Sequence, residues 1–194
     1  NIVARGGDGN DWLGLGVSQL AQEKLDKAEG TLKGAQNMMK DNPYPSLHLA
    51  KLYKAKKELE KEKEAVERAI SIQPGNVDAW AYLFNAVKEG ESEEAAIAKI
   101  EELANAPVNA KTAAPYVALQ GFYAGEEATR DKAVTFAKKA VDRNPTDPIP
   151  LIVLSALYGQ TGKIDEVVKL LAPHEALMRE DVRLAHNYFE ALFQ

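Results

Sequence analysis

The residues that could carry phosphate chemistry are Gly159, Gly162 and Lys163, which share part of the spacing of a nucleotide-binding P-loop. A complete P-loop needs glycine at position 157 and serine or threonine at position 164, because its backbone amides and its hydroxyl hold the phosphates and magnesium. The sequence has Leu157 and Ile164 at these positions. We therefore interpret the segment as a turn between two helices.

Metal chemistry has little support in the sequence. Residues 8–11 begin like a calcium loop, but such a loop needs glutamate at its twelfth position, and the sequence has Gln19 there. The chain contains no cysteine, and its three histidines have no metal-ligand spacing. These histidines are His48, His174 and His186. The sequence therefore predicts no metal site and no cofactor.

Composition limits the other classes of function. The 194 residues contain no cysteine nucleophile and no Gly-x-Ser-x-Gly elbow, so we do not expect an enzyme. The net charge of -5 argues against nucleic acid as a partner. The longest largely apolar run, 148–158, is far shorter than the roughly 20 residues of a membrane span, so no direct membrane insertion is expected. A soluble protein of the cytoplasm or periplasm is the expectation.

Four prolines stand in similar contexts along the chain, at intervals of 31, 33 and 38 residues with a mean of 34. They are Pro43, Pro74, Pro107 and Pro145. Apolar residues precede and follow them at the three- and four-residue spacing of one helix face. One such stripe before a proline is Ala133, Phe136, Ala137 and Ala140. Two stripes after a proline are Trp80, Leu83, Phe84 and Val87, and Leu151, Leu154, Ser155 and Tyr158. Each unit is therefore predicted to be two antiparallel helices joined by a short polar turn, as at 88–92 and 159–162, with no strand signal.

This pattern resembles the tetratricopeptide repeat (TPR) family. The third unit carries the resemblance best, through Trp80, Leu83, Phe84, Val87, Ala96, Ile100, Leu103 and Pro107. The second carries it through Leu49, Ala50, Tyr53, Val66, Ala69 and Pro74. The resemblance implies an all-α fold, a right-handed superhelix of antiparallel helix pairs of the α-solenoid type.

The resemblance also divides the chain. Residues 1–10 are expected to be a flexible leader and residues 11–180 about five tandem TPR-like helix pairs, with extra residues around 109–113. Glu62 stands where a small alanine is usual, which predicts a splayed or shifted helix pair. Residues 181–194 are either a capping helix or the start of a further, truncated repeat. Residues 190–194 also resemble what a picornaviral-type protease leaves at an engineered site, and a native helix is the other interpretation.

In TPR proteins the first helix of each pair lines a concave groove, and the resemblance implies the residues of such a groove here. They are Tyr44, Leu47, Lys51, Lys54, Asp78, Ala81, Tyr82, Asn85, Lys88, Ala118, Phe122, Ile149, Ile152 and Ala156. The expected groove is apolar and aromatic, with lysines along one part. Leu47 and Ala118 stand where a chaperone-tail clamp would need charges, so that variant is disfavoured.

The resulting hypothesis is a scaffold that binds a peptide or helix of another protein in this groove and helps to assemble a complex. The alanine- and lysine-rich composition, the short turns and the absence of cysteine suggest a bacterial protein. Its resemblance to bacterial scaffolds of this family implies a role in secretion, pilus or envelope assembly. The alternative is a self-assembling structural module, a homo-oligomer that stacks through terminal helices carrying Phe189 and Phe193.

Overall fold

The computed structural model describes residues 7–193, and within them all regular structure is helical, which confirms the predicted all-α class. The chain forms two compact units, Asn1–Asn109 and Ala110–Gln194. Each unit consists of helices packed on their sequence neighbours, and each is described by itself.

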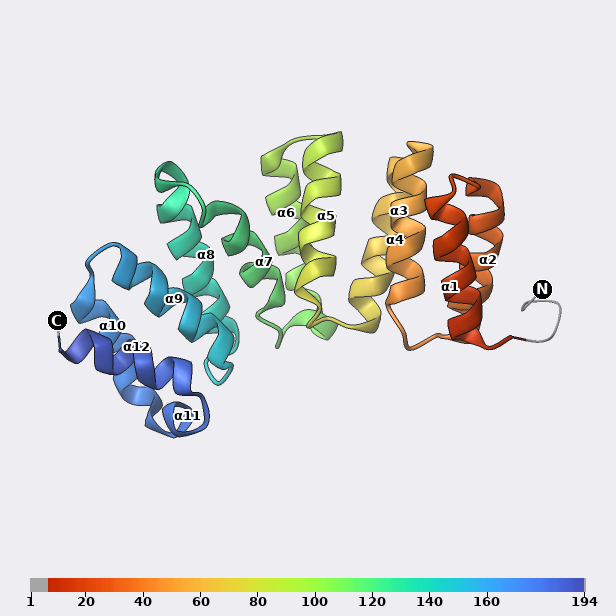
Figure 1. The fold of residues 1–194 in the computed structure, drawn as a ribbon. Coiled ribbons are helices and arrows are strands. Elements are labelled where there is room, and N and C mark those ends of the chain that lie inside the picture. The colour runs from red at the N-terminus through yellow and green to blue at the C-terminus, as the bar shows by residue number, and fades with distance from the viewer. Residues whose placement is uncertain (1–6, 194) are drawn as a thin grey trace. The chain divides into compact units, whose positions relative to one another are not determined.

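The first unit is a set of three antiparallel helix pairs. The pairs are α1 (Gly9–Ala21) with α2 (Leu25–Met38), α3 (Tyr44–Lys56) with α4 (Leu59–Ile72), and α5 (Val77–Gly90) with α6 (Glu93–Ala104). A 3-10 turn, Pro107–Asn109, follows α6. Figure 1 shows the first helices α1, α3 and α5 as one layer, with their partners forming a second layer behind them. The predicted alternation of first and second helices is therefore present in this unit.

The core of the first unit lies between these two layers. Trp80 and Phe84 of α5 are fully buried, and the Trp80 indole Nε1 donates a 2.8 Å hydrogen bond to the Pro74 carbonyl oxygen. Buried alanines let neighbouring helices approach closely, while the large side chains fill the space between pairs. The alanines are Ala28, Ala35, Ala50, Ala65, Ala69 and Ala96. The apolar stripes read from the sequence are thus the surfaces that pack.

Helix ends in the first unit follow the local chemistry of their caps. Helix α1 begins at Gly9, two residues before its expected start, because the Asp8 carboxylate accepts hydrogen bonds from the Asn10 and Asp11 backbone amides. The Asn76 and Ser92 side chains cap α5 and α6 in the same way. Of the predicted leader, 1–10, residues 1–6 lie outside the described residues.

An ion-pair cluster joins the first two helix pairs. Lys56 Nζ at the end of α3 lies 2.6 Å from Glu29 Oε2 and 2.9 Å from Asp26 Oδ1, both on α2. Lys33 contacts the same Glu29 carboxylate at 2.8 Å. Hydrogen bonds from Lys33 and Lys56 lower the Glu29 pKa to about 2, so this carboxylate is ionised at neutral pH.

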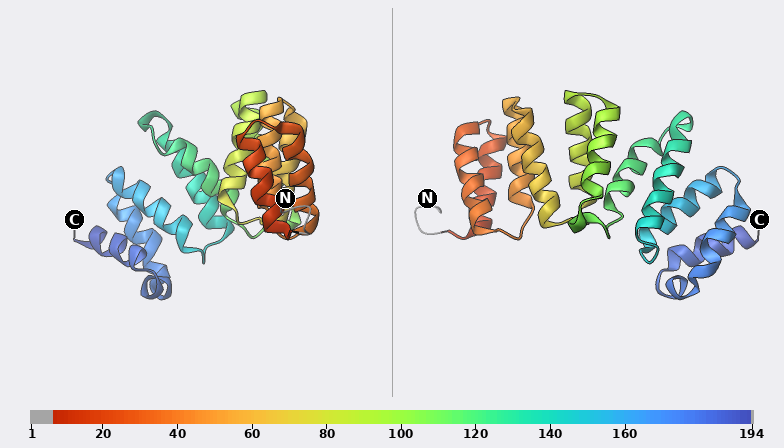
Figure 2. Two further views of the ribbon diagram at one scale, coloured as in Figure 1. Left: turned by 45° about the vertical axis from the view of Figure 1, so that its right-hand side comes forward. Right: turned by 180° about the vertical axis from the view of Figure 1, so that it is seen from behind.

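The second unit contains α7 (Ala114–Tyr123), α8 (Arg130–Arg143), α9 (Pro148–Gln160), α10 (Ile164–Leu171), α11 (Glu175–Glu180) and α12 (Val182–Leu192). Helices α7 and α8 form one antiparallel pair, and α9 with α10 a second (Figure 2). The residues before α7, from 105 to 113, form turns and a short 3-10 segment, where extra residues were expected. Helix α10 ends at Leu171, and the 3-10 segment Ala172–His174 carries the chain into α11.

Helix α12 packs against both α9 and α10. Leu184 is fully buried and Ala191 nearly so, which attaches both ends of α12 to the unit. Its opposite side carries Phe189, which is 55% exposed, together with Val182 and Leu192. Whether α12 is a cap or part of a further repeat stays a proposal.

Candidate functional site

The predicted groove residues of the first unit lie along α3 and α5, and all of them have accessible side chains. Tyr44, Lys51 and Lys54 on α3 are exposed, and Leu47 between them is half-buried. Asp78, Asn85 and Lys88 on α5 are exposed, while Ala81 and Tyr82 are half-buried. We call these residues the first-helix face. Helix α3 packs on α2 and α4, and α5 packs on α4 and α6, so the first-helix face is a part of α3 and α5 left open to a ligand.

The lysines of the first-helix face do not form a basic row. Lys54 Nζ lies 2.6 Å from Glu89 Oε2 on α5, and Lys88 Nζ lies 2.9 Å from Glu93 Oε2 at the start of α6. Among the described residues no acidic group pairs with Lys51. Each pair cancels a positive charge, so the expected lysine-lined part of the groove keeps little net charge.

Beneath Lys54 and Glu89, a carboxylate and a phenol hydroxyl lie buried side by side. Glu62 of α4 is only 5% exposed, and the Tyr82 hydroxyl of α5 faces its carboxylate. Glu62 Oε1 and Tyr82 Oη nevertheless lack a hydrogen bond of good geometry. Burial raises the pKa of Glu62, against the opposing effects of Tyr82 and Lys54. Burial and the neighbouring Glu62 charge raise the pKa of Tyr82.

This arrangement also explains how α3 and α4 accommodate Glu62 in place of a small residue. The side chain is enclosed towards α5, and α3 and α4 still pack as a regular antiparallel pair. The sequence-based expectation of a splayed or shifted pair is therefore not needed to explain Glu62. The cost of a large polar side chain here is an incompletely hydrogen-bonded buried carboxyl group.

The groups of the first-helix face best suited to hold a polypeptide are Asn85 and Tyr44. Within the described part of the chain, no residue hydrogen-bonds to the Asn85 side chain, so its carbonyl oxygen and its NH₂ group both remain available. A primary amide can accept from and donate to the same extended backbone. Tyr44 is 55% exposed and offers a large rigid surface at low entropic cost.

The second unit holds the remaining predicted residues. Phe122 on α7 and Ile149 on α9 are exposed apolar side chains, and Ile152 of α9 is half-buried. Ala118 is buried, which corrects its assignment to an accessible groove: one turn before Phe122, it faces the core of the unit instead.

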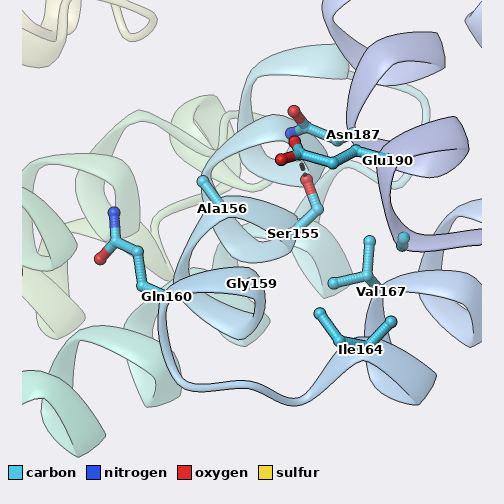
Figure 3. A pocket seen from close by; sticks show the side chains of 9 residues that line it. Ser155, Ala156, Gly159, Gln160, Ile164, Val167, Asn187 and Glu190 are labelled. Carbon is cyan, nitrogen blue, oxygen red and sulfur yellow. Dashed lines mark hydrogen bonds between the residues drawn. The ribbon is translucent and has the colours of Figure 1, made fainter. Parts of the chain in front are cut away.

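A pocket of about 310 Å³ lies between α9, α10 and α12 of the second unit. One wall is formed by the small residues Ser155, Ala156 and Gly159 of α9, and Asn187 and Glu190 of α12 stand opposite (Figure 3). The remaining lining residues are Gln160, Ile164, Val167 and Ala191. Asn187 Nδ2 donates a 2.8 Å hydrogen bond to Ser155 Oγ, which ties α12 to α9 beside the pocket.

Of these pocket residues, only Ala156 was predicted from the sequence to line the binding groove. Ser155 was read as part of an apolar packing stripe, and it is indeed buried. The sequence feature that could have identified Ser155 is its hydroxyl within an otherwise apolar stripe. A buried hydroxyl needs a hydrogen-bond partner, so its presence predicts a polar group nearby. Asn187 gave no comparable signal, since its partner lies 32 residues away in the chain.

The structure adds two findings about other classes of site. Within residues 7–193, no group of three or more histidine, aspartate or glutamate side chains is placed to hold a metal ion. None of the described helices has the length and apolar character needed to cross a membrane.

Comparison with known protein families gives one match. Residues 46–76, which cover α3 from its third residue onward, the turn and α4, match the family model described as a tetratricopeptide repeat. Comparison with curated protein sequences gives no match.

Solved structures with a similar fold are TPR proteins. Yeast Tom70 is 18% identical with a TM-score of 0.50, and the match covers 96% of this chain and 40% of that one. A thermophilic TPR protein of Thermus thermophilus is 21% identical over 96% of this chain and 100% of that one, with a TM-score of 0.47. The pilF protein of Pseudomonas aeruginosa is 12% identical over 94% and 88%, with a TM-score of 0.45. The Tom70 match supports the fold.

Proposed function

We propose that this chain, which carries a tetratricopeptide repeat at residues 46–76 within an array of similar helix pairs, is a protein–protein interaction scaffold. Its first-helix face, on α3 and α5, binds a peptide or helix of another protein. The partner is held while a larger complex assembles, and the chain itself performs no chemical step.

The observation that carries this proposal is the character of the exposed surface on α3 and α5. Tyr44 is exposed and Leu47 half-buried, so both offer apolar contact, while Asn85 presents its side-chain amide. Large apolar contacts with a few well-placed polar groups are typical of peptide-binding surfaces. Because Glu89 and Glu93 pair with Lys54 and Lys88, the face favours a ligand recognised by apolar contact and backbone hydrogen bonds over a strongly acidic one.

A peptide selection tests the proposal. Peptides are selected from a displayed random library against the full chain, and their affinities are measured for the wild type and for Tyr44→Ala/Asn85→Ala. Both residues are exposed, so the double variant should fold like the wild type, which circular dichroism checks. We expect the double variant to bind at least tenfold more weakly, because it loses an aromatic contact and a two-sided hydrogen-bonding group.

The matched control is Glu64→Ala/Arg68→Ala, which changes two exposed residues of α4, a second helix. We expect it to retain the wild-type affinity within about twofold, since surface changes outside an interface have small effects. Equal binding by the wild type and Tyr44→Ala/Asn85→Ala would reject the first-helix face as the working surface.

A second candidate function rests on the outer side of α12. Val182 and Phe193 are 78% and 87% exposed there, beside the exposed Phe189 and Leu192. Clustered exposed apolar residues often mark an association surface, and self-assembly through this helix would use it. Sedimentation velocity at two concentrations tests the idea. A mass that rises with concentration for the wild type but not for Phe189→Ser would support self-assembly, and a constant monomer mass would reject it.

The pathway is a proposal separate from the binding surface. Bacterial secretion, pilus or envelope assembly fits a scaffold of this type. A protein partner that binds the wild type but not Tyr44→Ala/Asn85→Ala would identify the pathway. A partner from an unrelated process would replace this expectation without affecting the binding surface.

A further inference from the structure

The pocket between α9, α10 and α12 has the size of a site for a single side chain. At about 310 Å³ it is at the lower end of the range of small-molecule pockets, roughly 300–1,000 Å³. Gly159 lines it, and a Cβ added at this glycine would meet no atom within 4 Å, so the wall beside α9 is open space. A narrow group can therefore enter between α9 and α12.

The polar side of this pocket offers acceptors. The single hydroxyl hydrogen of Ser155 goes to the Ile152 carbonyl oxygen at 3.0 Å, so only the NH₂ group of Asn187 can face Ser155 Oγ. That hydrogen bond leaves the Asn187 carbonyl oxygen as an available acceptor. The Glu190 carboxylate lines the same pocket, on the same helix as Asn187, and adds a negative charge (Figure 3).

The charged surroundings of Glu190 leave this negative charge available. Among its lining residues the pocket has no lysine or arginine. The neighbouring His186 Nε2 lies 3.6 Å from Glu190 Oε2, and this contact is an ion pair only when the imidazole is protonated. His186 is not among the residues that line the pocket, so within the lining the Glu190 carboxylate has no cationic partner.

The other walls are apolar. Ile164 and Val167 of α10 and Ala156 of α9 line the pocket with aliphatic groups. A ligand that fits must therefore combine an aliphatic stem with a cationic head that donates several hydrogen bonds. Arginine has this character, because its methylenes pack on apolar surface and its guanidinium carries five N–H donors in one plane.

We infer that the α9–α12 pocket binds an arginine side chain of the protein partner, with the guanidinium at Asn187 and Glu190 and the stem along Ile164, Val167 and Ala156. The inference rests on the proposed function only in taking a protein as the source of the arginine. The pocket gives the scaffold a charge-selective anchor in the second unit, separate from the nearly neutral first-helix face.

An NMR titration with small probes tests the pocket without any partner. The wild-type chain at pH 8 is titrated with N-acetyl-arginine amide and with N-acetyl-citrulline amide, which has nearly the same shape and no charge. We expect the amide signals of residues 155–160 and 187–191 to shift with the arginine probe at millimolar concentrations. The citrulline probe should bind at least about tenfold more weakly, because it cannot pair with the Glu190 carboxylate.

Two variants sharpen the result. Glu190→Gln should lower the affinity for the arginine probe about tenfold and leave that for the citrulline probe unchanged. Ala156→Leu, at an exposed position, should fill the pocket and abolish the shifts from both probes. As a control, His186→Gln changes a neighbouring side chain that does not line the pocket and should leave the affinity for the arginine probe unchanged.

The inference is overturned if the two probes bind equally, if Glu190→Gln leaves the arginine affinity unchanged, or if no shift appears near α9 and α12 up to about 100 mM probe. None of these outcomes depends on Tyr44 and Asn85. Loss of the arginine site with intact peptide binding at the first-helix face would reject this inference alone, and the reverse result would reject the proposed function alone.

Discussion

Lys54 Nζ of α3 lies 2.6 Å from Glu89 Oε2 of α5, so two first helices from successive pairs are joined by an ion pair 35 residues apart in sequence. The pair lies at the surface, with the two side chains 48% and 60% exposed. Both charges act on the buried Glu62 carboxyl group of α4, whose pKa is lowered by Lys54 and raised by Glu89. On the exposed face of the first unit, Lys54 is therefore paired with an acidic residue of a neighbouring helix and is not a separate positive charge.

The Lys54–Glu89 pair should contribute little to stability. Exposed ion pairs are solvated and screened, and their coupling energies are typically below about 1 kcal/mol. In a double-mutant cycle with Lys54→Ala, Glu89→Ala and the double variant, we expect a coupling within this limit that decreases further in 1 M salt. Urea unfolding followed by circular dichroism measures it. A coupling above about 2 kcal/mol would show that the pair is effectively buried in solution.

Glu62→Gln should stabilise the protein in a pH-dependent way. Burial raises the folded-state pKa of Glu62 above its ordinary value of 4.5. The contribution of Glu62 to the free energy of unfolding is therefore fully present below about pH 4.5, where the carboxyl group is protonated in both states. It is lost as the pH rises through the folded-state pKa, because ionising the buried group in the folded state is costly. Glutamine keeps the shape without the charge. We expect Glu62→Gln to match the wild type at pH 4 and to exceed it by about 1 kcal/mol in unfolding free energy at pH 7.

Urea unfolding at pH 4, 5.5 and 7 measures this difference, with Glu64→Gln as the matched control. Glu64 lies two residues further along α4 and is exposed, so its change to glutamine should leave the pH profile unchanged. A Glu62→Gln variant that is less stable than the wild type at pH 7 would contradict the expected cost of the buried carboxylate.

The helix pairs were predictable from sequence because each is set by local periodicity. The stripe Trp80, Leu83, Phe84 and Val87 is buried as a whole, and so is the stripe Leu151, Leu154, Ser155 and Tyr158. A helix that buries one side has an apolar residue every three to four positions along its sequence. Element ends were less certain: α5 continues to Gly90, within the expected turn at 88–92, since helix ends also depend on capping contacts.

The surface chemistry was only partly predictable. The exposure of Tyr44, Lys51 and Asn85 follows from helical phase, which a stripe of buried neighbours reveals. The pairing of Lys54 with Glu89, and of Ser155 with Asn187, depends on how successive pairs stack. Stacking angles come from many side-chain volumes together, so no single motif in the sequence encodes these contacts.

Trp80→Phe tests the link between the turn after α4 and the core. The Trp80 indole is fully buried and donates to the Pro74 carbonyl oxygen, so phenylalanine leaves both a small cavity and an unpaired acceptor. Together these predict a loss of roughly 1–3 kcal/mol in unfolding free energy. Urea unfolding followed by circular dichroism measures it, because removing one of the two tryptophans alters the fluorescence signal. A loss below about 0.5 kcal/mol would indicate that the indole hydrogen bond is replaced by water.

Two glycines of α2 give a matched test of close packing in the first pair. A Cβ at Gly30 would meet no atom within 4 Å, whereas one at Gly34 would collide with the ring of Trp12 from α1. Alanine in a helix interior is favoured over glycine by roughly 0.5–1 kcal/mol, so Gly30→Ala should gain about that much stability. At Gly34 the same gain is opposed by overpacking of roughly 1–3 kcal/mol, so Gly34→Ala should lose about 1 kcal/mol overall. Thermal unfolding of both variants, followed by circular dichroism, compares them directly, and an increase in Tm for Gly34→Ala would show that the Trp12 ring does not pack on α2.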